Sequence, residues 1–233
     1  MTKALSYKPC QKRIPLTRIQ KLIGERMLKS KRNKPCFYVE SKADVTELMS
    51  LRPKLRKSLG VKITTNIFYI RALALATKKY PLTAGKFDGA NIKIGDSINV
   101  GFALNAPQGL VVPVIKSADK KTLVEIAELE KSLTEKARDN QLTLEDIQGE
   151  TIALSNLGAY GVDSFLGIVP PPASTILAVG NVIKMARPLA GKTTVRKMVN
   201  MSLAVDHRII GGSYAAEFLN FIKEQLQEPQ RLV

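Results

Sequence analysis

Residues 66–79 form a segment that is apolar on nearly every side, and this is the pattern of a helix that is buried all round. Pro81 follows and breaks the helix, because proline lacks the amide hydrogen that a further turn needs. A helix without a polar face must be covered by other elements, so we expect it to lie under a sheet. The 233 residues suffice for such a core, since a chain of this length buries roughly 70% of its unfolded surface.

The other segments show strand and helix patterns in no strict alternation. Strand patterns occur at residues 37–44, in short pieces from 86 to 115, and at 151–154, 175–182 and 196–205; helix patterns begin at Thr17, 44, 122 and 213. Capping boxes are expected for Asp44 with Glu47 and for Thr122 with Glu125. A doubly wound nucleotide fold would need stricter alternation. The sequence therefore predicts one α/β domain over residues 14–233, an α+β sandwich with a mixed sheet and flanking helices.

Few side chains in this sequence can hold a metal ion or a disulfide framework. The chain has two cysteines, Cys10 and Cys36, and one histidine, His207, so we expect no metal site of the Cys/His kind. The longest apolar run is interrupted by Arg71 and is too short to cross a bilayer, so no membrane partner is expected. Residues 1–13 are polar and basic without a signal-peptide core, and we interpret them as a linker or N-terminal arm.

The positive charge is concentrated near the N-terminus. The formal net charge is +16, and residues 1–62 hold 17 Lys or Arg against 4 Asp or Glu. Such a stretch can attract nucleic acid, an anionic membrane or a phosphate-bearing ligand, and it is most often a solvated helix face. Because it contains no zinc finger and few interleaved aromatic residues, we expect no nucleic-acid partner. We interpret the charge as an attraction for the phosphates of a ligand or for acidic partner domains.

His207 is the only imidazole, and it stands at the end of a predicted strand before a Gly-Gly pair. Strand ends often present catalytic side chains, but position alone favours a buried structural histidine or a surface one. The surrounding sequence, Asp206-His-Arg-Ile-Ile-Gly-Gly212, resembles the HxxxDG signature of the chloramphenicol acetyltransferase-like acyltransferases. It is similar to the DHRxxDG form found in the dihydrolipoamide acyltransferase (E2) core of 2-oxoacid dehydrogenase complexes.

Four further segments, in the same order, resemble that family. They are the opening helix at Ile14 to Met27, Gly109-Leu-Val-Val-Pro-Val114, Ala153-Leu-Ser-Asn-Leu-Gly158, and Ile168 to Gly180. The resemblance covers nearly the whole chain and implies a chloramphenicol acetyltransferase-like fold. It also implies acyl transfer between a dihydrolipoyl thioester and coenzyme A, with the lipoyl group carried on a separate domain that this chain lacks.

The resemblance assigns roles to two residues. His207 would remove the proton of the attacking thiol, and Ser155 would donate a hydrogen bond to the oxyanion of the tetrahedral intermediate. Without the resemblance, Ser155 reads as a turn residue that ends a strand. In the family the imidazole and the hydroxyl come from neighbouring subunits. The implied partners are therefore two further copies in a homotrimer, with a larger hollow core left open, together with lipoyl domains and the E1 and E3 components.

Three positions depart from the family pattern. Gly211 stands where the motif has aspartate, Gln20 stands where the opening helix has arginine, and Cys36 replaces a histidine. In the family the aspartate and the arginine are thought to form an ion pair that supports the catalytic loop, and loss of both is often nearly neutral for stability. These departures put the activity in doubt. For Cys36 the expected role is a free buried cysteine.

Three functions follow from the resemblance. The leading one is an acyltransferase that moves an acyl group between dihydrolipoamide and coenzyme A as the core of a 2-oxoacid dehydrogenase complex. The alternatives are a catalytically attenuated structural core component and a stand-alone acetyltransferase that uses coenzyme A. The implied location is the cytoplasm of a bacterium or archaeon, or the mitochondrial matrix.

Overall fold

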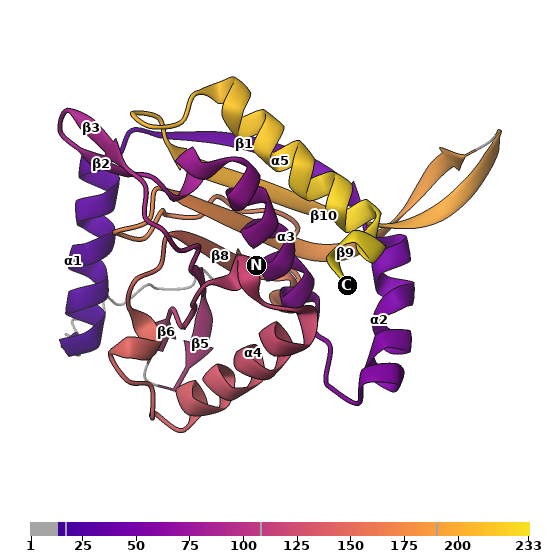
Figure 1. Cartoon of the computed structure of the whole chain (residues 1–233), viewed down its shortest axis with the longest axis horizontal. Helices are drawn as coiled ribbons and strands as arrows, with labels where there is room; N and C mark the ends of the chain where they lie inside the picture. The colour runs from indigo at the N-terminus through magenta and orange to yellow at the C-terminus, as the bar shows by residue number, and fades with distance from the viewer. Residues whose placement is uncertain (1–13, 17, 108, 190) are drawn as a thin grey trace, which may run out of the picture.

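A six-stranded mixed sheet runs through the computed structural model, which describes residues 14–233 apart from 17, 108 and 190 (Figure 1). Its strand order is β1 (Cys36–Asp44), β10 (Lys192–Asp206), β9 (Thr175–Leu189), β8 (Ile152–Asn156), β4 (Val100–Phe102) and β7 (Val114–Ile115). Strand β8 runs parallel to β9 and β4, and the other neighbours are antiparallel. The expected mixed sheet is confirmed.

Five helices and two small hairpins complete the described chain. The helices are α1 (Arg18–Asn33), α2 (Thr46–Leu59), α3 (Thr65–Lys79), α4 (Leu123–Arg138) and α5 (Gly212–Gln227), and the hairpins pair β2 (Lys86–Asp88) with β3 (Asn91–Lys93) and β5 (Leu104–Ala106) with β6 (Gly109–Val111). Short 3-10 turns lie at Pro81–Ala84, Ala118–Lys120, Glu145–Ile147, Gly158–Tyr160 and Pro229–Leu232.

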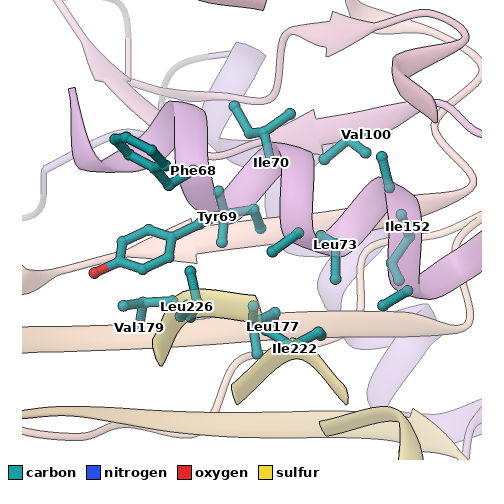
Figure 2. Packing of buried hydrophobic residues seen from close by; sticks show 14 of the residues in the cluster. Phe68, Tyr69, Ile70, Leu73, Val100, Ile152, Leu177, Val179, Ile222 and Leu226 are labelled. Atoms are coloured by element: carbon teal, nitrogen blue, oxygen red, sulfur yellow. The ribbon is translucent and has the colours of Figure 1, made fainter. Parts of the chain in front are cut away.

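Helix α3 is the buried helix that its apolar sequence predicts. Phe68, Tyr69, Ile70 and Leu73 are at most 1% exposed. Figure 2 shows them packed with side chains of the sheet and of α5, which are Val100, Ile152, Leu177, Val179, Ile222 and Leu226. The sheet and the surrounding helices thus supply the cover that a helix without a polar face needs.

The two faces of the sheet are covered differently. Leu154 of β8 belongs to the large core under the helices, whereas Ala153 joins a small cluster with Val169, Ile176 and Ala204 on the opposite face. Because side chains alternate along a strand, Ser155 shares the face of Ala153 and Asn156 shares the helix face of Leu154. This alternation determines the surroundings of both residues.

The element ends agree with the sequence at some points and correct it at others. Thr122 and Glu125 form the expected capping box of α4. The expected box of Asp44 with Glu47 is wrong: Val45 occupies the cap position of α2, and Asp44 Oδ1 instead accepts hydrogen bonds from the amide and the hydroxyl of Thr46. The start expected at Thr17 lies outside the described residues.

Strands β9 and β10 are longer than the sequence predicts. They continue as a paired ribbon to Leu189 and from Lys192, beyond the expected limits of 182 and 196. The far end of this ribbon projects from the rest of the molecule (Figure 1). A projecting ribbon needs no alternation of buried and exposed residues, so it leaves no period-2 signal in the sequence.

Candidate active site

His207 directly follows β10 and its side chain is exposed. Its backbone amide donates a 2.9 Å hydrogen bond to the carbonyl of Pro35, and its ring packs on that of Phe37 in a T-shaped arrangement, at a centroid distance of 5.2 Å and an angle of 86°. Residues at the start of β1 thus orient the imidazole, while the rest of the ring is exposed to solvent. A side chain held in this way can exchange protons with a molecule that arrives from outside the chain.

Asp206 and Arg208, the residues on either side of His207, form an ion pair. Asp206 is 1% exposed, and its carboxylate accepts hydrogen bonds from Arg208 Nε at 2.9 Å and Nη2 at 2.6 Å. The guanidinium also lies 4.2 Å from the centre of the Phe87 ring in β2. A bidentate pair of this kind fixes both position and angle. The sequence motif Asp-His-Arg contains this pair in three adjacent residues, but the ion pair itself was not predicted from it.

Lys34 approaches the same turn from the end of α1. Its ammonium donates a hydrogen bond to the carbonyl of Ala173. Burial lowers the pKa of Lys34, and the nearby Asp206 opposes that shift. The buried carboxylate therefore has a second cation near it, which the sequence analysis also did not single out.

Ser155 lies far from His207 in the same chain. In the sheet register Ser155 is opposite Ala178 of β9, and Ala178 is opposite Ser202 of β10. His207 is five residues beyond Ser202, which places it about 17 Å further along the strands and about 10 Å across them. The two predicted site residues are therefore about 20 Å apart within one chain. Direct cooperation between them needs a second chain.

The Ser155 hydroxyl is available to a ligand. The residue is half-buried, and its side chain makes no hydrogen bond to the part of the chain that the structure describes. The neighbouring Asn156 is used structurally: its Nδ2 donates to Asn66 Oδ1 at 2.7 Å, and its Oδ1 accepts from the amide of Gly158. The strand end is thus anchored by the asparagine, and the serine stays unengaged.

Gly211 has room for a side chain. It caps α5 with φ −75° and ψ 165°, a conformation open to any residue, and a Cβ atom added there meets nothing within 4 Å. Gln20 does not face it within one chain. It is exposed on α1, 14 residues before Lys34 and therefore about 20 Å from the end of the helix that approaches the histidine turn. Any pairing between positions 20 and 211 has to join two chains.

Cys36 is half-buried and free, so the expectation of a buried cysteine is corrected. It pairs with Asp206 across β1 and β10, at the edge where the sheet meets solvent. Burial raises the pKa of the Cys36 thiol, and Asp206 adds to that rise. The thiol is therefore not an activated nucleophile. Cys10 lies outside the described residues.

No cluster of three or more His, Cys, Asp or Glu side chains suited to a metal ion occurs among the described residues. No described helix is long and apolar enough to span a membrane.

An apolar cleft of about 390 Å³ lies between α1 and β6. Arg26 lines this cleft: its Nη2 donates a hydrogen bond to the carbonyl of Pro171 at 2.6 Å and lies 3.5 Å from Glu150 Oε1.

Comparison with known sequences gives consistent matches. The sequence model described as 2-oxoacid dehydrogenases acyltransferase (catalytic domain) matches residues 8–233. The dihydrolipoyllysine-residue succinyltransferase component of the 2-oxoglutarate dehydrogenase complex of Haemophilus influenzae is 34% identical over 227 residues, covering 96% of this chain and 56% of that protein. The dihydrolipoyllysine-residue acetyltransferase component of the pyruvate dehydrogenase complex of Rickettsia bellii is 34% identical over 232 residues, covering 97% and 56%. The chain thus spans little more than half the length of these relatives.

Solved structures match the fold closely. The dihydrolipoamide acetyltransferase of Azotobacter vinelandii superposes with a TM-score of 0.90 at 30% identity, covering 95% of this chain and 93% of that one. The cubic core of the pyruvate dehydrogenase multienzyme complex gives a TM-score of 0.90 at 31% identity, with coverage of 95% and 93%. A chloramphenicol acetyltransferase gives 0.51 at 12% identity, covering 88% and 92%, which concerns the fold alone. The expected chloramphenicol acetyltransferase-like fold is confirmed.

The structural work on the Azotobacter vinelandii protein concerns the role of a serine, a histidine and an asparagine in its catalytic mechanism. In that protein the serine precedes the histidine by 52 residues and the asparagine follows it by four. Ser155 and His207 have the same spacing of 52 residues, and the position four residues after His207 is Gly211. The side chain that this chain lacks at 211 is an amide in that relative, where the motif expectation was a carboxylate.

Proposed function

This chain belongs to the 2-oxoacid dehydrogenases acyltransferase (catalytic domain) family, and we propose that it moves an acyl group between dihydrolipoamide and coenzyme A as the core of a 2-oxoacid dehydrogenase complex. The observation that carries the proposal is the placement of His207: an exposed imidazole on a turn that Asp206 and Arg208 fix from both sides. Residues 14–233 constitute the catalytic domain in this proposal.

The chemistry follows from the two side chains. His207 takes the proton from the thiol of coenzyme A as its sulfur attacks the carbonyl of the acyl-dihydrolipoamide thioester. The carbonyl oxygen becomes an oxyanion, and the Ser155 hydroxyl donates a hydrogen bond to it. When the intermediate collapses, the carbon–sulfur bond to dihydrolipoamide breaks, and the departing thiolate takes the proton back from the imidazolium. The reverse reaction uses the same groups.

The 20 Å separation of the two residues supports an assembly of several chains. We propose that Ser155 of one chain meets His207 of a neighbour in a homotrimer, because a cyclic arrangement satisfies each such contact once around a closed ring. The relative named as a cubic core supports further assembly of trimers into a hollow particle. Lipoyl domains and the E1 and E3 components are the proposed partners of residues 14–233.

An acyl-transfer assay on the purified chain tests the proposal. The panel contains acetyl-, succinyl- and branched-chain acyl-coenzyme A with free dihydrolipoamide as acceptor, and the expected result is turnover of at least one donor that His207→Ala abolishes. The absence of turnover above the His207→Ala background, in a chain that assembles normally, would contradict the enzymatic role. It would support instead the second candidate, a structural core component, which the missing side chain at Gly211 favours.

A further inference from the structure

Residues 169–173 form a segment whose buried carbonyl groups need hydrogen-bond donors from elsewhere. The segment reads Val-Pro-Pro-Pro-Ala, and Val169 and Ala173 are fully buried. Proline has no amide hydrogen, so three consecutive prolines cannot pair with a neighbouring strand through their amides. A buried carbonyl without a donor is costly, because the water around its oxygen is removed and nothing replaces it. Another element therefore has to supply the donors.

Helix α1 supplies them from one of its faces. Three side chains spaced four residues apart each donate a hydrogen bond to a carbonyl of this segment: Arg26 to Pro171, Ser30 to Val169 and Lys34 to Ala173. Lys34 continues the helix beyond Asn33, since its amide donates to the carbonyl of Ser30 at 2.9 Å. Positions four apart lie on the same face of a helix. This face of α1 therefore fastens the segment along its whole length.

The same segment supports the backbone of the histidine turn. The amide of Asp206 donates to the carbonyl of Ser174, and the amide of His207 donates to the carbonyl of Pro35, both at 2.9 Å. Ser174 directly follows residues 169–173, and Pro35 lies between α1 and β1. Two neighbouring amides of the turn are thus held by supports that come from distant parts of the chain.

Lys34 joins these two supports. It precedes Pro35 in the chain, and its ammonium donates to the carbonyl of Ala173, which precedes Ser174. A side chain that bridges both supports keeps their separation constant. That separation sets where the turn lies between them, and with it the position of the His207 backbone.

The ammonium of Lys34 also acts on the carboxylate of Asp206. Asp206 is 1% exposed, so protein groups rather than water have to balance its charge. Arg208 binds the carboxylate through two hydrogen bonds, and Lys34 is a second cation in its surroundings. Burial lowers the pKa of the Lys34 ammonium, while attraction by Asp206 opposes that shift and favours the charged form. A hydrogen bond and a charge therefore both tie Lys34 to the turn.

We propose that Lys34 is a positioning residue of the acyl-transfer site, which acts on His207 through Asp206 and through the two supports of the turn. The proposal rests on the acyl-transfer function proposed above. It differs from a purely structural anchor in its consequence for kinetics. Loss of the ammonium should slow the chemical step more than it weakens substrate binding, because a misplacement of about 1 Å can cost on the order of a hundredfold in rate.

Steady-state acyl transfer by variants at position 34 tests the proposal. Lys34→Met keeps the length of the side chain without its charge or donors, and we expect kcat to fall about tenfold or more while the KM for coenzyme A changes less than about twofold. Lys34→Arg keeps a cation with donors and should recover more turnover than Lys34→Met. Lys29→Met is the matched control, because Lys29 is exposed on the same helix, and it should behave as the wild type.

A milder variant separates lost positioning from lost folding. Lys34→Gln keeps a donor for the carbonyl of Ala173 without the charge, so its kcat should lie between those of Lys34→Met and the wild type. Circular dichroism and light scattering identify the variants that fold and assemble normally. If Lys34→Met does not fold, a fall in the kcat of Lys34→Gln supports the proposal and an unchanged kcat overturns it. With both folded, an unchanged kcat in Lys34→Met, or equal losses in Lys34→Met and in Lys29→Met or Lys34→Arg, would overturn it.

A second readout does not depend on turnover. His207 is the only histidine of the chain, so isotope-labelled histidine gives one imidazole signal in an NMR spectrum. We expect Lys34→Met to broaden or split this signal, because the turn then samples several positions, and Lys29→Met to leave it unchanged. A wild type without turnover would contradict the proposed function, and the imidazole signal would then decide alone. Broadening or splitting in Lys34→Met supports the positioning role, and a signal identical to that of the wild type overturns it.

Discussion

Arg208 donates two hydrogen bonds to the buried carboxylate of Asp206, and the residue between them is the only histidine of the chain. The pair spans two positions, so the backbone of His207 is fixed by its own neighbours as well as by the hydrogen bond of its amide to the carbonyl of Pro35. Stacking of Arg208 on Phe87 ties the same guanidinium to β2. Orientation of the imidazole therefore depends on the ion pair as well as on the ring contact with Phe37.

Removing the guanidinium leaves the buried carboxylate without its main partner. We expect Arg208→Ala to lower the free energy of unfolding by about 3 kcal/mol, because Asp206 then carries an uncompensated charge in the interior. Arg208→Lys should recover part of the stability and less of the turnover, since lysine cannot form the bidentate contact. Urea titration and the acyl-transfer assay measure the two effects. Equal kcat values for Arg208→Lys and the wild type would show that turnover does not depend on the bidentate contact between Arg208 and Asp206.

Several parts of the fold could be predicted because their signals are local. The apolar circumference of α3 and the capping box of Thr122 with Glu125 each depend on residues a few positions apart. The cap expected at Asp44 was wrong because both carboxylate oxygens are engaged elsewhere: Oδ1 accepts from Thr46, and Oδ2 accepts from Arg196, 152 residues away. The family resemblance implied that Ser155 and His207 come from different subunits, but their separation within one chain has no local signal, because it follows from the register of three strands.

Acidification should loosen the attachment of the β9–β10 ribbon to β1. Partial burial acts to raise the pKa of Asp44, but the hydrogen bonds from Thr46 and Arg196 outweigh it and hold the pKa below its ordinary value of 3.8. A carboxyl with a depressed folded-state pKa contributes stability above the unfolded pKa and loses it as the pH falls through the folded one. Below pH 3.8 the wild type should therefore lose stability. Asp44→Asn should be less stable at neutral pH and show a flatter acid limb in urea titrations from pH 7 to about 2. Parallel limbs in both proteins would contradict this assignment.

A polar side chain at position 211 should stabilise the N-terminus of α5. Asparagine is a good cap residue and glycine a moderate one, so we expect Gly211→Asn to raise the free energy of unfolding by a few tenths of a kcal/mol, about 0.5 at most. Gly211→Ala is the control, because it fits the same open space without an oxygen and should be the least stable of the three. The midpoints of thermal unfolding give the order of stability of the wild type and the two variants. If the loop around His207 lacks support in the wild type, Gly211→Asn should also raise kcat.

Positions 20 and 211 offer a test of contact between chains. Gly211→Asp alone should not help activity, because the new carboxylate has no cation to meet. Adding Gln20→Arg should rescue it only if the two positions meet across a subunit boundary, since Gln20 lies about 20 Å from the end of α1 that approaches the histidine turn. A double-mutant cycle on kcat gives the coupling energy. Purely additive effects would exclude the pairing and leave the rest of the site untouched.

The separation of Ser155 from His207 makes the strongest prediction, because it concerns assembly and chemistry together. Light scattering should show a trimer or a multiple of it, and a stable monomer at micromolar concentration would contradict the shared site. In that assembly His207→Ala should lose most of the turnover, and Ser155→Ala should lose about a hundredfold in kcat with little change in KM, as expected for an oxyanion donor.

Mixing the two inactive variants should then restore activity. When His207→Ala and Ser155→Ala chains are co-expressed with different tags and purified through both, some boundaries bring the intact serine of one chain to the intact histidine of another. A trimer that holds both variants has one complete boundary in three, so about a third of wild-type turnover should return. The double variant carrying both changes in one chain, mixed with wild type and purified in the same way, is the matched control: a complete boundary there needs two wild-type chains, so about a sixth of the boundaries are complete at equal incorporation. Recovery in the control without recovery in the mixture of single variants would show that each site lies within one chain, against the register of β8, β9 and β10.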